Sequence, residues 1–245
     1  MQWEYPFQAA TREPAKTSVS ALRRRLRDGA EEEGHVPKFA VSQSSFARHN
    51  PVPGELSAVE IGTAHHRFLQ FFDFTKPVEP RILLVEATRL EEAGVLSAAE
   101  REALDIPALF AFWQSEIGQH IRVQAGNVHR ELEFTARFSP EDLQAIELYP
   151  KAAAIGEEFV VVQGVVDLAV ILPEEIWLVD FKTDHGNASE LAEKTLTYQR
   201  QLGMYARALR QIYGRPVTRS WLHFLTSGQS VSLQLDESAE RGVSG

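Results

Sequence analysis

Between positions 58 and 123, apolar residues recur at intervals of three and four, the spacing that gathers side chains on one face of an α-helix. This pattern predicts a helix over residues 58–73 and a second helix, RILLVEATRLEEAG, that ends at Gly94. Ser97 and Glu100 form a capping-box signature for the start of a third helix. The stretch IPALFAFWQSEIGQHI predicts a fourth helix, so this half of the patterned chain is expected to be helical.

After residue 128 the hydrophobic period changes to two. In HRELEFTARF the apolar side chains alternate with polar ones, which is typical of a half-buried strand. EEFVVVQGVVDLAVIL and IWLVDFK predict two further strands, and ASELAEKTLTYQRQLGMYARALRQIYG predicts a long helix that ends at Gly214. VTRSWLHFLTSG and QSVSLQL predict the closing strands. The order of these elements predicts a mixed α/β (α+β) domain over residues 58–245.

Residues 1–57 lack such periodicity and contain many polar residues, prolines and glycines. We interpret them as a connecting segment, partly irregular, with one short basic helix in TSVSALRRRL. The dense basic run ALRRRLR within it is interpreted as a solvated helix face rather than as a phosphate contact. The opening residues show no signal-peptide pattern.

Composition narrows the class of protein. Of the 245 residues, 44% are apolar and 24% are charged, as in ordinary globular proteins, and no apolar run approaches the length that spans a bilayer. The sequence has no cysteine, which excludes disulfides, thiolate zinc sites and iron–sulphur clusters and fits a cytoplasmic location. The net charge of −9 argues against wrapping nucleic acid by electrostatics alone. A bound divalent cation can reverse the field at one site, so DNA binding is not excluded.

The stretch GVVDLAVILPEEIWLVDFKTD places charges inside apolar strands. If the hairpin turns between Pro173 and Glu174, antiparallel counting sets Asp167 opposite Asp180, with Lys182 on the same face as Asp180. Two carboxylates at such a short distance repel each other unless a cation lies between them, and oxygen ligands suit Mg²⁺ or Mn²⁺. The alternative is a structural Asp–Lys ion pair, which we would favour for an isolated D-x-K sequence.

Further candidates are individually weak. His66 lies on the first predicted helix beside His65, and either could be a packed helix residue. Glu131 lies on the polar side of its strand, where plain solvent exposure is the simpler interpretation. Gln201 and Tyr205 share one face of the long helix, with Tyr198 one turn earlier, and packing of this face into the core is the simpler interpretation.

The sequence contains no G-x-x-x-x-G-K-[ST] motif, so we expect no ATP site.

Taken in order, GTAHH, RELEF, GVVD with VDFKTD, and YQRQLGMY resemble the motifs of RecB-type nucleases of the PD-(D/E)xK superfamily, and most closely the C-terminal nuclease domain of AddA-type helicase–nuclease subunits. The resemblance implies a restriction-endonuclease-like core of a helix, three strands, a helix and a strand, preceded here by extra helices. Counting from Gly62 selects His66 as the histidine of the family motif.

The resemblance also implies roles for single residues. His66, Asp167 and Asp180 would bind one or two Mg²⁺ or Mn²⁺ ions, with the carbonyl of Phe181 as a further ligand. Lys182 would be the catalytic lysine that acts on the attacking water, and Glu131 would bind metal or water at the edge of the site. Gln201 and Tyr205, with Tyr198 nearby, would position the DNA strand or support the site.

The function implied is exonuclease-type hydrolysis of single-stranded DNA, or of an unwound duplex end, in double-strand break repair and recombination. The expected partners are a helicase motor in the same full-length chain and an AddB-type protein, in the bacterial cytoplasm at the nucleoid. A non-catalytic DNA-binding or scaffolding module with the same fold is the alternative. A site-specific endonuclease would need a base-reading element, which the sequence does not show.

Overall fold

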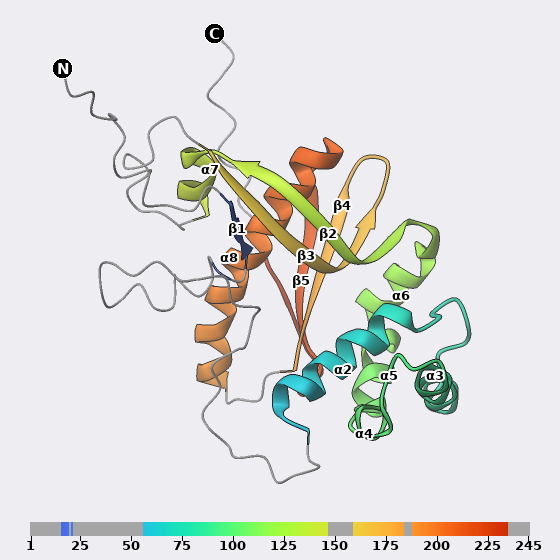
Figure 1. Cartoon of the computed structure of the whole chain (residues 1–245). Helices are drawn as coiled ribbons and strands as arrows, with labels where there is room; N and C mark the ends of the chain where they lie inside the picture. The colour runs from blue at the N-terminus through green and yellow to red at the C-terminus, as the bar shows by residue number, and fades with distance from the viewer. Residues whose placement is uncertain (1–15, 20, 22–55, 147–158, 184–187, 235–245) are drawn as a thin grey trace, which may run out of the picture.

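A six-stranded mixed sheet separates two layers of helices (Figure 1). The structure is a computed structural model that describes residues 16–19, 21, 56–146, 159–183 and 188–234. One apolar core lies between the sheet and helix α8 (Ala188–Tyr213), and the other lies between the opposite face and helices α2–α6. Within the described residues, no helix is long and apolar enough to cross a membrane. The mixed α/β prediction is confirmed.

The helices before the sheet match the predicted pattern with one correction. They are α2 (Ala58–Phe71), α3 (Pro80–Glu92), α4 (Ala98–Glu102), α5 (Ile106–Gln114) and α6 (Glu116–Val123), followed by the short 3₁₀ turn η2 (Ala125–Asn127). The capping box of Ser97 and Glu100 is confirmed at the start of α4. Helix α7 (Pro140–Ala145), which the periodicity did not predict, follows strand β2.

The prediction of a single helix over IPALFAFWQSEIGQHI is wrong, because the helix is interrupted at Ser115, which lies between α5 and α6. The Ser115 hydroxyl donates to the Phe112 carbonyl at 2.6 Å and accepts from the Gly118 amide at 3.2 Å, so this residue ends α5 and caps α6. Gly118 brings the two helices into close contact: a Cβ there would lie 2.3 Å from the Phe112 carbonyl oxygen. Hydrophobic periodicity cannot report such a cap, since both helices present apolar residues to the same core.

The sheet contains β1 (Lys16–Ser18), β2 (Val128–Phe138), β3 (Val160–Ile171), β4 (Ile176–Lys182), β5 (Val217–Phe224) and β6 (Gln229–Ser232). Its order is β1-β3-β4-β5-β6, with β2 paired to β3. The predicted helix over TSVSALRRRL is wrong at its start, because Thr17 and Ser18 belong to β1, which pairs in parallel with β3. The arginines of that run lie outside the described residues.

Strand β3 changes partner halfway along its length, and this opens the sheet. Its second half pairs with β4 from Leu168 to Ile171, whereas its first half pairs with β1 from Val161 to Gln163. Strand β2 pairs with β3 along both halves, apart from a gap at Glu131. The strands β3 and β4 therefore separate just before Leu168, and we call this point the fork.

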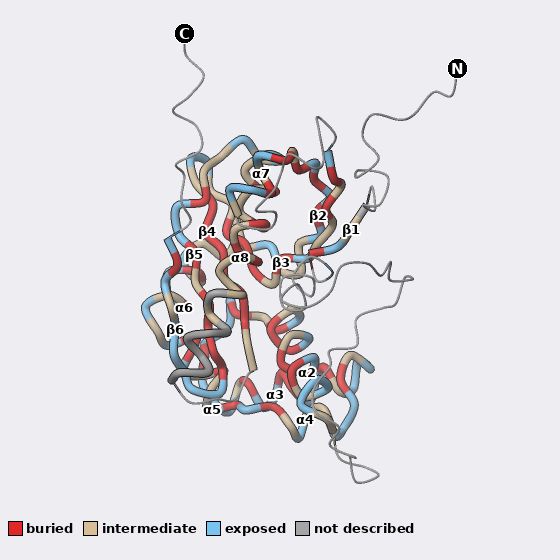
Figure 2. The backbone as a smooth tube through the Cα atoms, turned by 90° about the vertical axis from the view of Figure 1, so that its left-hand side faces the viewer, coloured by how far each residue is buried: buried red, intermediate tan, exposed pale blue. Residues whose placement is uncertain are grey.

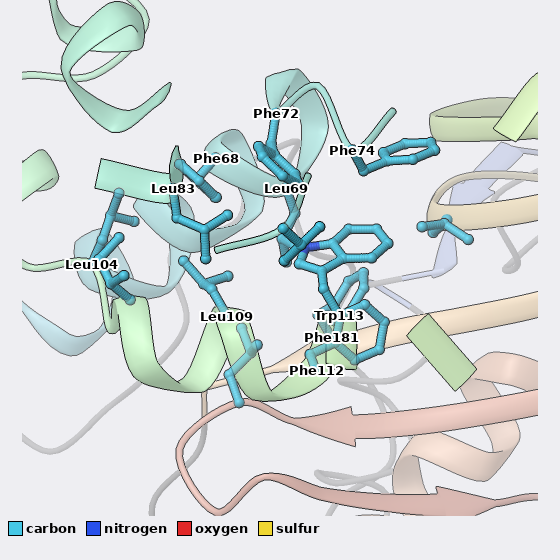
Figure 3. Packing of buried hydrophobic residues seen from close by; sticks show 14 of the residues in the cluster. Phe68, Leu69, Phe72, Phe74, Leu83, Leu104, Leu109, Phe112, Trp113 and Phe181 are labelled. Carbon is cyan, nitrogen blue, oxygen red and sulfur yellow. The ribbon is translucent and has the colours of Figure 1, made fainter. Parts of the chain in front are cut away.

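Aromatic side chains fasten α2 to the sheet. Figure 3 shows Phe72, which follows α2 directly, between Phe68 of α2 and Trp113 of α5, with Phe112 and Phe181 of β4 next to Trp113. Each side chain is almost fully buried, and burying one such ring contributes about 1.5–3 kcal/mol. Figure 2 shows buried residues along the strands and on the sides of the helices that face the sheet. This packing fixes the position of α2 relative to the fork.

Replacing Gly118 by alanine is predicted to destabilise the fold, because the new Cβ would overlap the Phe112 carbonyl and lie 2.7 Å from the Trp113 Cα. Such overpacking typically costs about 1–3 kcal/mol. Thermal unfolding should show a lower melting temperature for Gly118→Ala. Gly126→Ala is the matched control, because a Cβ there meets nothing within 4 Å. Equal melting temperatures for the two variants would contradict this account.

Candidate active site

The fork brings together the charged residues of the hairpin as the predicted register requires. Leu168 pairs with Val179 and Ile171 with Ile176, and the Leu172 amide donates to the Glu175 carbonyl to close the turn. One step further along the same register, Asp167 faces Asp180 just beyond the last ladder pair. The predicted hairpin is therefore confirmed.

Asp167 is held by the neighbouring strand. The Phe181 amide donates to Asp167 Oδ2 at 2.8 Å, and Asp167 Oδ1 lies 3.5 Å from His66 Nδ1. Burial alone would raise the pKa of Asp167, but the nearby His66 charge, with smaller contributions from Lys182 and the Phe181 amide, keeps it below its usual value. The carboxylate is thus fixed, charged and directed toward α2.

His66, Glu131 and Asp167 form a compact group from three separate elements. Their ligand atoms all lie within 4.8 Å of one another. Burial would lower the pKa of His66, but the Asp167 charge and hydrogen bonds to both carboxylates raise it to about 10. His66 Nδ1 thus lies 3.5 Å from Asp167 Oδ1 and 3.9 Å from Glu131 Oε1, where both carboxylates favour the charged form of the ring.

The backbone of Glu131 is strained. Its φ of 48° is the one positive value for a non-glycine among the described residues, and such a conformation costs about 1–3 kcal/mol. It coincides with the gap in the β2–β3 ladder opposite Asp167. Beyond this residue β2 follows the predicted alternation, with Phe134, Ala136 and Phe138 buried. The irregularity lies where the carboxylate joins the group.

The structure separates the two adjacent histidines. The buried His65 contacts the Ile61 carbonyl through Nδ1 at 2.8 Å and accepts from the Asp105 amide through Nε2 at 2.9 Å. Burial lowers its pKa, so it is a neutral link between α2 and the start of α5. His66 points to the fork instead. Packing therefore agrees with the motif spacing, which selected His66 by its distance from Gly62.

Gly62 lies one helical turn before His66 and lets α2 approach the end of β4. A Cβ at Gly62 would lie 2.8 Å from Thr183 Oγ1. This contact explains physically why a glycine precedes the histidine by four residues. Thr183 was not among the predicted site residues, although it lies within the stretch VDFKTD that drew attention to the hairpin.

Arg130 is a second residue that the sequence did not single out. Its Nη1 donates to the carbonyls of Leu69 at 3.2 Å and Phe72 at 2.5 Å, at the end of α2. Its guanidinium also lies 4.9 Å from the centre of the Phe74 ring. Arg130 thus fastens β2 to α2 next to Glu131, and only the tertiary contact reveals this role.

Asp180 and Lys182 form a buried ion pair beside the group. Lys182 Nζ lies 2.5 Å from Asp180 Oδ2, and Asp180 is 1% exposed. Burial, together with the Asp167 charge, raises the pKa of Asp180 although Lys182 opposes the shift. The ion pair that the sequence offered as an alternative to a metal site is therefore present, beside the group that could bind a cation.

Helix α8 supports this pair. Gln201 Nε2 lies 3.4 Å from Asp180 Oδ1 and donates to Tyr205 Oη at 2.6 Å. Lys182 Nζ lies 4.6 Å from the centre of the Tyr198 ring, close enough for a cation–π contact. Gln201 and Tyr198 therefore contact the hairpin charges, and Tyr205 bonds to Gln201.

The donor set fits a divalent cation. His66 Nδ1 lies 3.5 Å from Asp167 Oδ1 and 3.9 Å from Glu131 Oε1, both below the distance of about 4.2 Å between opposite ligands of an ion with bonds of about 2.1 Å. Asp180 lies outside this three-residue group and binds Lys182 instead. The assignment of Asp180 and the Phe181 carbonyl as metal ligands stays a prediction.

Gly62→Ala is predicted to lower the melting temperature by filling the space that Thr183 Oγ1 occupies, at a cost of about 1–3 kcal/mol. The double variant Gly62→Ala/Thr183→Ala removes the clashing hydroxyl and should regain most of the loss. Thr183→Ala alone serves as the control. A double variant no more stable than Gly62→Ala would show that another contact requires the glycine.

Comparison with known proteins places the site in a family. Residues 38–242 match the family model of the PD-(D/E)XK nuclease superfamily. The chain is 32% identical, over 93% of its length, to an ATP-dependent helicase/nuclease subunit of Moorella thermoacetica, and 30% identical, over 97%, to that of Listeria welshimeri. It spans only 16% and 19% of these two relatives. The match to the family model covers helices α2–α8, strands β2–β6 and every residue of the site, and the chain belongs to the PD-(D/E)XK nuclease superfamily.

Proposed function

We propose that this chain is a Mg²⁺- or Mn²⁺-dependent, exonuclease-type nuclease domain that hydrolyses phosphodiester bonds of single-stranded DNA. The observation that carries the proposal is the compact group of His66, Glu131 and Asp167 next to the Asp180–Lys182 pair. Neither an isolated acidic cluster nor an isolated ion pair would combine cation ligands with a buried ammonium.

His66, Glu131 and Asp167 would hold the cation, with Asp180 and the Phe181 carbonyl as further ligands. The bound cation would lower the pKa of a water molecule and neutralise charge on the phosphoryl oxygen. Because the Phe181 amide already fixes Asp167, this ligand needs little reorganisation. The proton on His66 must leave before its nitrogen can act as a ligand.

Lys182 would act on the attacking water and on the charge of the transition state. Its side chain is 13% exposed, which is enough to reach the substrate at the fork. Tyr198 contacts the ammonium, and Gln201 steadies the Asp180 partner, so the lysine is held before substrate arrives. A donor held in this way stabilises developing charge without reorganising during the reaction.

The biological setting follows from the relatives, whose names describe ATP-dependent helicase/nuclease subunits. We propose that this nuclease acts with a helicase motor in the same full-length chain and with an AddB-type partner. The motor would supply unwound strands during double-strand break repair in the bacterial cytoplasm. Since the chain spans less than a fifth of these relatives, the motor belongs to the remainder of their length.

Lys182→Met is predicted to lower cleavage of single-stranded DNA by about 10²–10³-fold, because the variant removes one charge-stabilising donor. Asp167→Asn should lose both cleavage and metal binding measured by calorimetry, whereas Lys182→Met should still bind metal. Glu174→Gln, at the exposed turn of the same hairpin, is the matched control and should retain both. If the wild-type protein binds DNA but neither Mg²⁺ nor Mn²⁺ supports cleavage, a non-catalytic DNA-binding module is the better assignment.

Metal binding is predicted to release a proton and to strengthen as the pH rises. The raised pKa of His66, about 10, means that at neutral pH the cation must displace a proton from the ring. Calorimetry in two buffers of different ionisation enthalpy should therefore show release of about one proton at pH 7. His66→Asn should weaken binding and remove this release. Unchanged proton release in the variant would exclude His66 as a ligand.

A further inference from the structure

A hollow opens from the candidate active site along the outer side of β2. Its volume is about 720 Å³, within the usual range of small-ligand sites. Gln70 and Phe71 of α2 form one part of its wall, and residues 128–133 of β2 form the rest. Glu131 belongs both to this wall and to the group that would hold the cation. The hollow and the candidate cation group are therefore adjacent.

Phe71 is the unusual member of this wall. Its neighbours Phe68 and Phe72 are fully buried, whereas Phe71 is 46% exposed and belongs to neither apolar core of the described residues. An exposed ring contributes little to folding. A ring at the rim of a site does offer a flat surface on which a base can stack, and such stacking tolerates any base sequence.

The charges of the wall favour a base over a phosphate. Arg130 is the one arginine in it, and its guanidinium already binds the Leu69 and Phe72 carbonyls. Glu131 and Glu133 would repel a phosphate that entered the hollow without a cation. The phosphate is therefore expected at the cation end of the site, with an uncharged, planar group in the hollow.

Strand β2 adds polar groups to this surface. Among the described strands it pairs with β3 alone, so its outer edge faces the hollow rather than another strand. Main-chain groups on such an edge can bond to the polar edge of a base. Gln70 and the exposed His129 add side-chain donors and acceptors.

We propose that the hollow receives one base of a single-stranded DNA substrate, stacked on Phe71, from the nucleotide next to the scissile phosphodiester. The inference rests on the proposed nuclease function and adds how the strand is held there. Stacking on one side of the cut fixes the strand without selecting its sequence, as a nuclease that degrades unwound strands requires.

The test measures binding of an oligothymidylate by fluorescence anisotropy with Mg²⁺ present, in a Lys182→Met background so that the strand stays intact. Phe71→Ala should weaken binding on the order of 10-fold, the usual effect of removing one stacked base. Phe71→Trp should retain binding. Val59→Ala is the matched control, because Val59 is 42% exposed on the same helix but does not line the hollow. Thermal unfolding should show that every variant keeps the fold.

A second arm moves one abasic nucleotide along the oligothymidylate. With Phe71 present, one position should weaken binding more than its neighbours, and Phe71→Ala should remove that difference, since the two changes delete the same contact. If wild-type protein cleaves the strand but neither Phe71→Ala nor any abasic position affects binding, the inference is overturned and the nuclease function stands. If wild-type protein cleaves no strand with Mg²⁺ or Mn²⁺, the proposed function itself fails.

Discussion

The hydrogen bond from the Phe181 amide to the Asp167 carboxylate is the contact on which the site depends. It spans the two strands at the point where their ladder ends and fixes the Asp167 carboxylate, whose charge is favoured mainly by His66 and to a smaller extent by this amide. Without this bond the fork would leave an unsatisfied amide and an acid free to turn away from His66. A single interaction therefore stabilises the opening of the sheet and directs one oxygen toward α2.

The remainder of the structure holds three elements against that fork. Aromatic packing of Phe72 on Trp113 fixes the position of α2 relative to the sheet, and Arg130 connects the end of the helix to β2 by hydrogen bonds. On the opposite face α8 brings Gln201 to Asp180. The two apolar cores are thus rigid supports on either side of a small polar site, and the strain at Glu131 persists because both cores fix the strand around it.

Charge is distributed unevenly across this site. The group of His66, Glu131 and Asp167 shares a proton on the imidazole, whereas Asp180 is neutralised by Lys182. Each carboxylate therefore has a cationic partner, which limits the cost of burying acids in an apolar sheet. A divalent cation would replace the proton of the first group and leave the second pair nearby.

The sequence by itself determined most of the helices and strands and the register that sets Asp167 opposite Asp180, because hydrophobic period and turn residues act locally. The hydrophobic period did not predict the cap at Ser115, which is a local bond to residues three positions away. The strand at Thr17 and the left-handed backbone at Glu131 lay beyond it because they depend on distant segments. The motif spacing from Gly62 selected His66, and the tertiary structure supplied the physical reason: His65 is buried against α5, whereas His66 faces the fork. It also exposed Phe71 beside a hollow, because exposure is a property of the assembled elements.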